Sequence, residues 1–156
     1  MSYVFDNGPF SQLFRNFFPS IFVTLWENFD QLVAESRIVS VREVLGEIED
    51  GSLERLREWA GNHLDIFAAP TAAEATFITQ IYAERHFQHN IEQQKLLKGG
   101  RIADPFVIAK AKIEDRTVVT TELLKPHAAK IPNICQHFGV PCMTVQQFME
   151  TEGWRF

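Results

Sequence analysis

Cysteine is scarce in this sequence. Only Cys135 and Cys142 occur among the 156 residues, and they lack the CxxC spacing of a zinc ribbon or a redox pair. A disulfide-rich scaffold is therefore excluded, and we expect free thiols and a cytoplasmic location. Long apolar runs are missing too, so we expect no membrane-spanning helix, and the first residues lack the basic segment of a signal peptide.

Several familiar site motifs are also absent. Gly99-Gly100 has neither the spacing nor the following Lys-Ser/Thr of a phosphate-binding loop, and no serine lies in a nucleophile elbow. His86 and His89 are three residues apart, a spacing that can bind zinc, but no third ligand lies nearby in the sequence. We therefore interpret both histidines as surface residues.

The composition is that of a globular domain. Apolar residues make up 46% of the chain and Phe occurs 14 times, which predicts one packed domain over residues 1–156. A net charge of −5 argues against a protein that coats nucleic acids. The charge is uneven, however, because residues 1–84 carry 13 acids and 5 bases, whereas residues 85–130 carry 5 acids and 9 bases. The basic segment fits a phosphate-binding surface and a solvated surface equally well.

Short apolar or β-branched runs alternate with helical patterns. Strands are predicted near residues 3–5, 37–39, 117–119 and 141–143. Apolar spacings of three and four predict helices over residues 10–17, 20–35, 41–49, 53–60, 106–113 and 145–152, with short pieces over 123–137. A longer helix is predicted from residue 71 towards residue 82 or 85, with a less regular, polar continuation to residue 98. This alternation predicts a three-layer α/β/α domain with a central parallel sheet of four or five short strands.

Local signals predict where three helices begin. Ser40 and Glu43 have the spacing of a capping box. Asp104 before a proline predicts an N-cap, and Thr144 predicts the cap of the last helix.

Acidic residues stand next to the ends of several elements. Asp6 ends the first strand, Asp104 begins a helix, and Glu122 follows the third strand. Because ligands of open parallel sheets bind at the carboxyl ends of the strands, we expect these acids to meet at one edge. Glu43 and Glu47 share a helix face after the second strand, and either fits as the fourth carboxylate. Clustered carboxylates repel one another, and Mg²⁺ or Mn²⁺ would relieve that repulsion and support phosphodiester hydrolysis.

Five segments in this order resemble the PIN domain, a nuclease fold. They are YVFD, REVLGEI, ADPFVIAKA, TVVTTE and the closing GVPCMTVQQFM. The stretches RNFFP, FVTLWENFDQLV and KIPNICQHFGVPC are similar to a bacterial and archaeal subfamily of PIN-like proteins, so the resemblance covers nearly the whole chain. On the matching positions, the resemblance implies an acidic metal site formed by Asp6, Glu47, Asp104 and Glu122.

The chain departs from the PIN pattern at two positions. Asn7 stands where many PIN domains have a small hydroxyl residue, and Glu122 stands where many have Asp. We expect both departures to affect the strength of activity more than the fold.

The resemblance also implies an activity and partners. PIN domains are typically Mg²⁺- or Mn²⁺-dependent ribonucleases, and many are dimeric toxins of type II toxin–antitoxin pairs. We therefore expect an endoribonuclease that leaves a 5′-phosphate and a 3′-hydroxyl, with an antitoxin partner or a second copy docked on the helices over residues 10–17 and 20–35. Core packing explains the apolar residues of these two helices at least as well. Lys110, Lys112 and Lys125, together with Lys130, are the candidate contacts to RNA phosphates, and a solvated surface is the competing interpretation of each.

Two other functions compete with this hypothesis. A haloacid-dehalogenase-like phosphatase also begins with a strand that ends in Asp, but it needs a second Asp two residues later, where this chain has Gly8. A PIN-like domain without catalysis would instead be an RNA- or protein-binding module. The presence of all four acids favours the nuclease, and measured metal affinity would distinguish the two.

Overall fold

Five short parallel strands form the central sheet of the computed structural model, which describes residues 1–156. In sheet order they are β3 (Phe67–Ala68), β2 (Ile38–Val41), β1 (Tyr3–Phe5), β4 (Thr117–Val119) and β5 (Cys142–Met143). All residues of the three inner strands are buried. Burial on both faces explains why these runs are mostly apolar and β-branched and do not alternate with polar residues.

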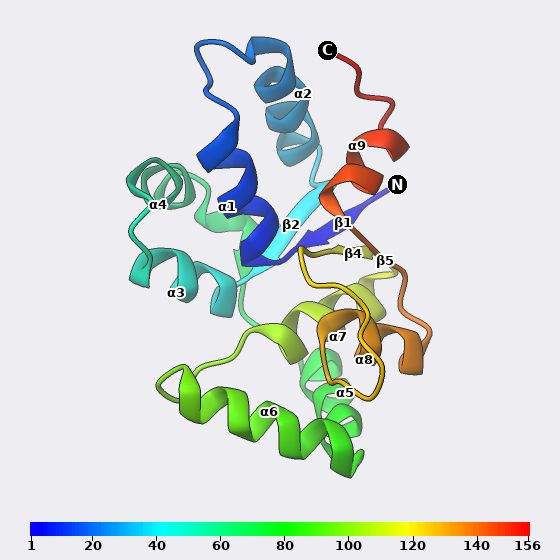
Figure 1. Ribbon diagram of the computed structural model, residues 1–156. Helices are drawn as coiled ribbons and strands as arrows, with labels where there is room; N and C mark the ends of the chain where they lie inside the picture. The colour runs from blue at the N-terminus through cyan, green and yellow to red at the C-terminus, as the bar shows by residue number, and fades with distance from the viewer.

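Helices cover both faces of the sheet. They are α1 (Asn7–Asn16), α2 (Val23–Ala34), α3 (Arg42–Asp50), α4 (Glu54–Gly61), α5 (Ala72–Ala83), α6 (Arg85–Leu97), α7 (Asp104–Glu114), α8 (Ile131–Phe138) and α9 (Val145–Thr151), with a 3₁₀ turn at Leu64–Ile66. Figure 1 shows α1, α2 and α9 above the sheet and α5 to α8 below it. The predicted three-layer α/β/α architecture is therefore confirmed. None of the helices combines the length and apolar character that crossing a bilayer requires.

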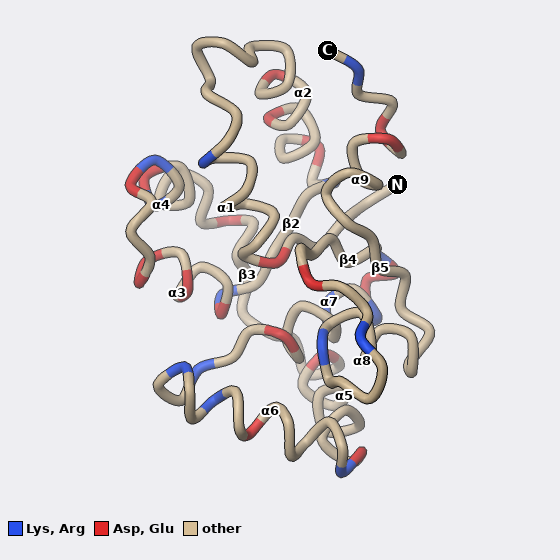
Figure 2. Tube along the Cα trace, viewed as in Figure 1, with Lys and Arg blue, Asp and Glu red and all other residues tan.

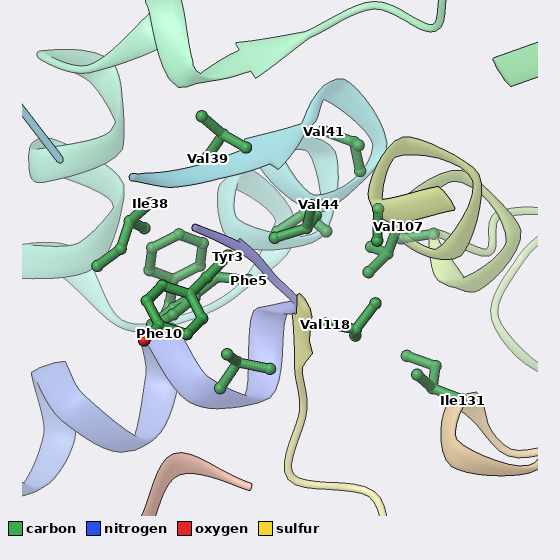
Figure 3. Close-up of a cluster of buried hydrophobic side chains, with 14 of the residues drawn as sticks. Tyr3, Phe5, Phe10, Ile38, Val39, Val41, Val44, Val107, Val118 and Ile131 are labelled. Carbon is green, nitrogen blue, oxygen red and sulfur yellow. The ribbon is translucent and has the colours of Figure 1, made fainter. Parts of the chain in front are cut away.

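Aromatic rings dominate the core on the α1 side of the sheet. The ring of Phe5 lies 5.2 Å from that of Phe10 and 5.1 Å from that of Phe148, centroid to centroid. On the other face, Val107 of α7 lies near Val118 of β4 (Figure 3). Both layers belong to one cluster of 39 buried apolar residues. Burial of this size is the main stabilising contribution to the fold.

The two ends of the chain are held together by a polar link. The Tyr3 hydroxyl donates a hydrogen bond to the Glu152 carboxylate, and Arg37 Nη2 lies 2.8 Å from Glu152 Oε2. The link connects β1 and the residue before β2 to the C-cap of α9.

The structure corrects the prediction that Ser40 caps a helix. Ser40 is fully buried within β2, and its hydroxyl donates to the Phe5 carbonyl at 2.7 Å. Helix α3 begins two residues later, after Val41, and has no side-chain cap. The capping-box spacing was misleading because β2 extends to Val41 and the Ser40 hydroxyl points to the Phe5 carbonyl of the neighbouring strand.

Other element boundaries also differ from the prediction. The two-residue strand β3 was not among the four strands predicted. The helix predicted from residue 71 ends at Ala83, within the predicted range, and its polar continuation forms the separate helix α6. Of the short helices predicted over residues 123–137, only α8 forms, with Pro132 in its first turn. The predicted cap of α9 is confirmed, because Thr144 Oγ1 accepts from the Gln147 backbone N–H at 3.2 Å.

Candidate active site

Asp6 lies buried where β1 passes into α1. Its side chain accepts a hydrogen bond from Thr120 Oγ1 at 3.3 Å, which connects the ends of β1 and β4. The Asn7 backbone N–H also stabilises the carboxylate. Burial opposes the charged form more strongly and raises the pKa of Asp6 to about 7. Asp6 is therefore a carboxylate whose charge the surrounding protein compensates only in part.

Asp104 is the first residue of α7, and Ala103 is the N-cap. The predicted capping role is therefore wrong, because the Asp104 side chain makes no cap hydrogen bond. Instead, its Oδ2 atom is buried without any hydrogen-bond partner. Burial and, next, the nearby charge of Asp6 raise the pKa of Asp104 well above its ordinary value. A buried carboxylate oxygen without a partner is costly unless a cation or proton neutralises it.

Glu47 of α3 faces the same group of charges. Burial raises its pKa, while the nearby Lys98 ammonium, the Ala103 backbone N–H and the Asn7 side chain lower it. Glu43, one turn earlier, instead pairs with Arg42 at 3.0 Å. Glu47 is thus the acid of α3 that lies within the electrostatic field of the other carboxylates.

Glu122 completes the group from the loop after β4. Its charge contributes to raising the pKa values of Asp6, Glu47 and Asp104. Its Oε2 accepts a hydrogen bond from the Ile131 backbone N–H at 2.8 Å, so that only Oε1 is free of protein hydrogen bonds. Figure 2 shows acidic stretches after β1, after β4 and at the start of α7, at the same edge of the sheet.

Gly8 lets α1 pack closely against the loop after β4. A Cβ atom at this position would collide with the Thr121 side chain. The turn of residues 120–122, which carries both Thr120 and Glu122, therefore lies against the first turn of α1. This contact places the end of β4 next to Asp6.

The donor set consists of carboxylate oxygens, the ligands that a hard divalent cation prefers. In the observed conformation, no three His, Cys, Asp or Glu side chains are close enough to bind one ion together. The unpartnered Oδ2 of Asp104 beside buried Asp6 nevertheless fits a hard cation that binds oxygen. Mg²⁺ keeps several of its waters and is usually bound through one or two carboxylates, so two direct ligands suffice and the other acids can act through water.

The three predicted RNA-contacting lysines are placed differently from one another. Lys110 is buried in α7 and pairs with Glu114 at 2.8 Å, and Lys112 donates to the Phe138 carbonyl at 3.1 Å. Both lie in the C-terminal half of α7, away from Asp104. The structure gives no support for phosphate contacts by Lys110, because its charge is buried and neutralised. Lys125 is exposed in the loop before α8.

Sequence reasoning missed two polar residues that act on the acids. Thr120 binds Asp6 from 114 residues away, and Lys98 lies near Glu47 and Asp104. The Thr-Thr-Glu sequence directly after β4 indicated that Thr120 lies near the acids. No local pattern distinguishes Lys98 from other exposed lysines.

The parallel sheet, its two helical layers and the acidic edge define a three-layer α/β/α domain with carboxylates at the carboxyl ends of its strands. The chain belongs to the family described as "Domain of unknown function (DUF4411)", whose model matches residues 3–156. A chain from the crystal structure of VapBC2 from Rickettsia felis, solved with a DNA fragment from their promoter, matches with a TM-score of 0.51 and 15% identity. The match covers 92% of this chain and 98% of that chain, and it shows a shared fold. No curated protein matches this sequence.

Proposed function

We propose that this protein is a Mg²⁺- or Mn²⁺-dependent endoribonuclease whose site is formed by Asp6, Glu47, Asp104 and Glu122. The observation that carries the proposal is the buried pair of Asp6 and Asp104, because Asp104 Oδ2 has no hydrogen-bond partner. A fold maintained with uncompensated carboxylates at one edge is best explained by a cation that binds there.

Each acid has a distinct part in the proposed site. Asp6 and Asp104 are the direct ligands, since they are the most deeply buried of the four. The Asn7 side chain and the Ala103 backbone N–H favour the charged form of Glu47, and Glu122 offers its Oε1 atom. When bound, the cation would supply positive charge for the phosphodiester and lower the pKa of a water molecule for in-line attack. Thr120 holds the Asp6 carboxylate in place through its hydroxyl.

We propose that the protein is the toxin of a toxin–antitoxin pair and that it binds an antitoxin or a second copy through the turn between α1 and α2. Most apolar residues of these helices are buried in the core, but Phe18, Ile21 and Val23 are 51%, 70% and 51% exposed. Neighbouring exposed apolar side chains commonly mark protein interaction sites. The resemblance to PIN toxins supports a partner of this kind, and a cytoplasmic location remains a prediction.

The nuclease proposal is tested by incubating a mixed RNA pool with the purified protein and Mg²⁺ or Mn²⁺. We expect cleavage that EDTA abolishes and that Asp6→Asn and Asp104→Asn reduce by at least about a hundredfold. Asp65→Asn is the matched control, because Asp65 is exposed and is not among the charges that act on Asp6, Glu47 and Asp104. Equal inertness of the natural chain and all variants would instead favour a binding module without catalysis.

A further inference from the structure

A cavity of about 310 Å³ opens directly beside the acidic edge. Thr120 and Glu122 belong both to its lining and to the hydrogen-bond network of the site. The remaining lining comes from the loop after β4, from α8 and from β5 with the start of α9. Its volume is at the lower end of the roughly 300–1,000 Å³ typical of ligand pockets, which suits one small group.

The wall of this cavity combines apolar surface with unused hydrogen-bonding groups. Leu124, Val140 and Met143 supply apolar surface. Gln147 Oε1 accepts from the Thr144 backbone N–H at 2.9 Å, so the Nε2 group of Gln147 is left to donate. The Gln136 side chain is exposed and makes no hydrogen bond within the protein, so its amide offers both a donor and an acceptor.

The charges around the cavity exclude a phosphate inside it and favour one beside it. Neither Lys nor Arg lines the cavity, whereas the acid Glu122 does. However, residues 123–149 contain no Asp or Glu, and Lys125 and Lys130 are exposed on the loop that leads to α8. In a chain of net charge −5, this acid-free segment is a suitable path for a phosphate backbone.

We propose that this cavity binds one unpaired nucleobase of a single-stranded RNA, next to the phosphodiester that the acids cleave. The inference rests on the proposed nuclease function. A base presents a flat apolar face, which Leu124 and Met143 can contact. Its edge carries hydrogen-bond donors and acceptors, which the amides of Gln136 and Gln147 can pair with. The cavity thereby selects unpaired strands over duplexes.

The path of the strand continues towards α6. A second hollow, of about 460 Å³, is lined by His86, His127, His137 and Phe87, and Gln136 lines both hollows. The second hollow offers imidazole donors and an aromatic ring at the position where the next nucleotide would lie. Gln136 therefore stands between two neighbouring nucleotides of the bound strand.

The test measures binding separately from cleavage. Labelled single-stranded RNA decamers, intact or with one base removed at each position in turn, are titrated with the protein in EDTA and followed by fluorescence anisotropy. We expect removal of one particular base to weaken binding by the natural chain about tenfold. The same removal should matter less than about threefold for Gln136→Ala and Leu124→Ala, whose affinity for the intact strand is already reduced.

Gln80→Ala is the matched control, since Gln80 is exposed on α5 and outside the cavity. Circular dichroism confirms that each variant is folded. The proposed base-binding cavity would be rejected if removal of any base left the affinity unchanged, or if the protein did not bind RNA at all.

A parallel cleavage assay with Mg²⁺ keeps the two proposals apart. If removal of each base near the cut leaves the rate of cleavage unchanged, the nuclease proposal is retained and the base-binding cavity is rejected. Base-dependent binding by a protein that never cleaves would retain the pocket and reject the nuclease.

Discussion

Glu122 connects the acidic edge to helix α8, because its Oε2 atom accepts a hydrogen bond from the Ile131 backbone N–H at 2.8 Å. This N–H belongs to the first residue of the helix and has no partner within it. Glu122 is therefore both a candidate ligand and a stabiliser of a helix N-terminus, where negative charge is favourable.

The two roles of Glu122 predict different effects of two substitutions. Glu122→Gln keeps an oxygen for Ile131, so we expect nearly unchanged stability but a loss of cleavage of about tenfold or more. Glu122→Ala removes both the candidate ligand and the acceptor for the Ile131 N–H. We expect it to lower the free energy of unfolding by about 1 kcal/mol as well as to lose cleavage. Urea unfolding together with RNA cleavage measures the two effects. Equal stability of both variants would show that the hydrogen bond to Ile131 contributes nothing.

The metal-free protein should lose stability as the pH rises. The pKa of Asp6 is raised from 3.8 to about 7 by burial, so between these values the folded state binds a proton that the unfolded state has released. The stabilisation is complete below about pH 4 and is lost as the pH rises through about 7. Relative to Asp6→Asn, we expect the natural chain to lose on the order of 2 kcal/mol from pH 5 to pH 8. Urea unfolding in EDTA measures this, and parallel curves would contradict it.

A bound cation should reverse this loss. Since a ligand that binds only the folded state stabilises it, Mg²⁺ or Mn²⁺ should raise the melting temperature of the natural chain by several degrees at pH 8. Asp104→Asn removes the ligand with the unpartnered oxygen and should show little rise, whereas Asp65→Asn should behave as the natural chain does. A rise of the same size in all three proteins would place the cation elsewhere.

Gly8→Ala should disrupt the site through packing alone. The added Cβ would collide with Thr121, and the turn of residues 120–122 would have to move. We expect a loss of about 1–3 kcal/mol in the free energy of unfolding, together with weaker cleavage. Gly61→Ala is the control, because a Cβ at Gly61 meets no atom within 4 Å. Combining Gly8→Ala with Thr121→Ala should restore part of the lost stability. If the effects of the two substitutions on the free energy of unfolding simply add, the contact between residues 8 and 121 is not the cause.

Lys98→Gln should shift the pH dependence of cleavage upwards. The Lys98 ammonium lowers the pKa values of Glu47 and Asp104, so without it both carboxyls deprotonate at higher pH. We expect cleavage at pH 6 to fall by roughly threefold, with little change at pH 8. Arg15→Gln, an equal change of charge at an exposed residue on α1, should leave the profile in place. A uniform loss at every pH would indicate instead that Lys98 contacts the RNA.

Sequence patterns identified the elements whose determinants are local. The runs Tyr3–Phe5 and Thr117–Val119 form β1 and β4 as predicted, because short β-branched and aromatic runs between turn residues favour buried strands. The cap at Thr144 formed for the same local reason. Strand β3 has only two residues and pairs at the edge of the sheet, so its sequence carries too little pattern to be recognised.

The environment of the acids could not be predicted in the same way. The sequence placed Asp6 and Glu122 after strands, and the topology of a parallel sheet then placed both at one edge. The contacts that determine their chemistry are tertiary, however. Thr120 reaches Asp6, Glu122 reaches Ile131, and Asp104 is left without a partner only because of how α7 packs. Ser40 illustrates the opposite error, where a convincing local spacing was overridden by pairing in the sheet.

The position of β1 in the middle of the sheet has a consequence for the protein's synthesis. β1 is made before its partner β4, which lies more than a hundred residues later, and the partner of Tyr3 in the polar link, Glu152, is made later still. Pairing across such separations makes folding slow, and it cannot begin until the later segments have been translated. The four acids are therefore still scattered on an unfinished chain. Any activity of these acids could therefore arise only after the segment that carries Glu122 has been translated.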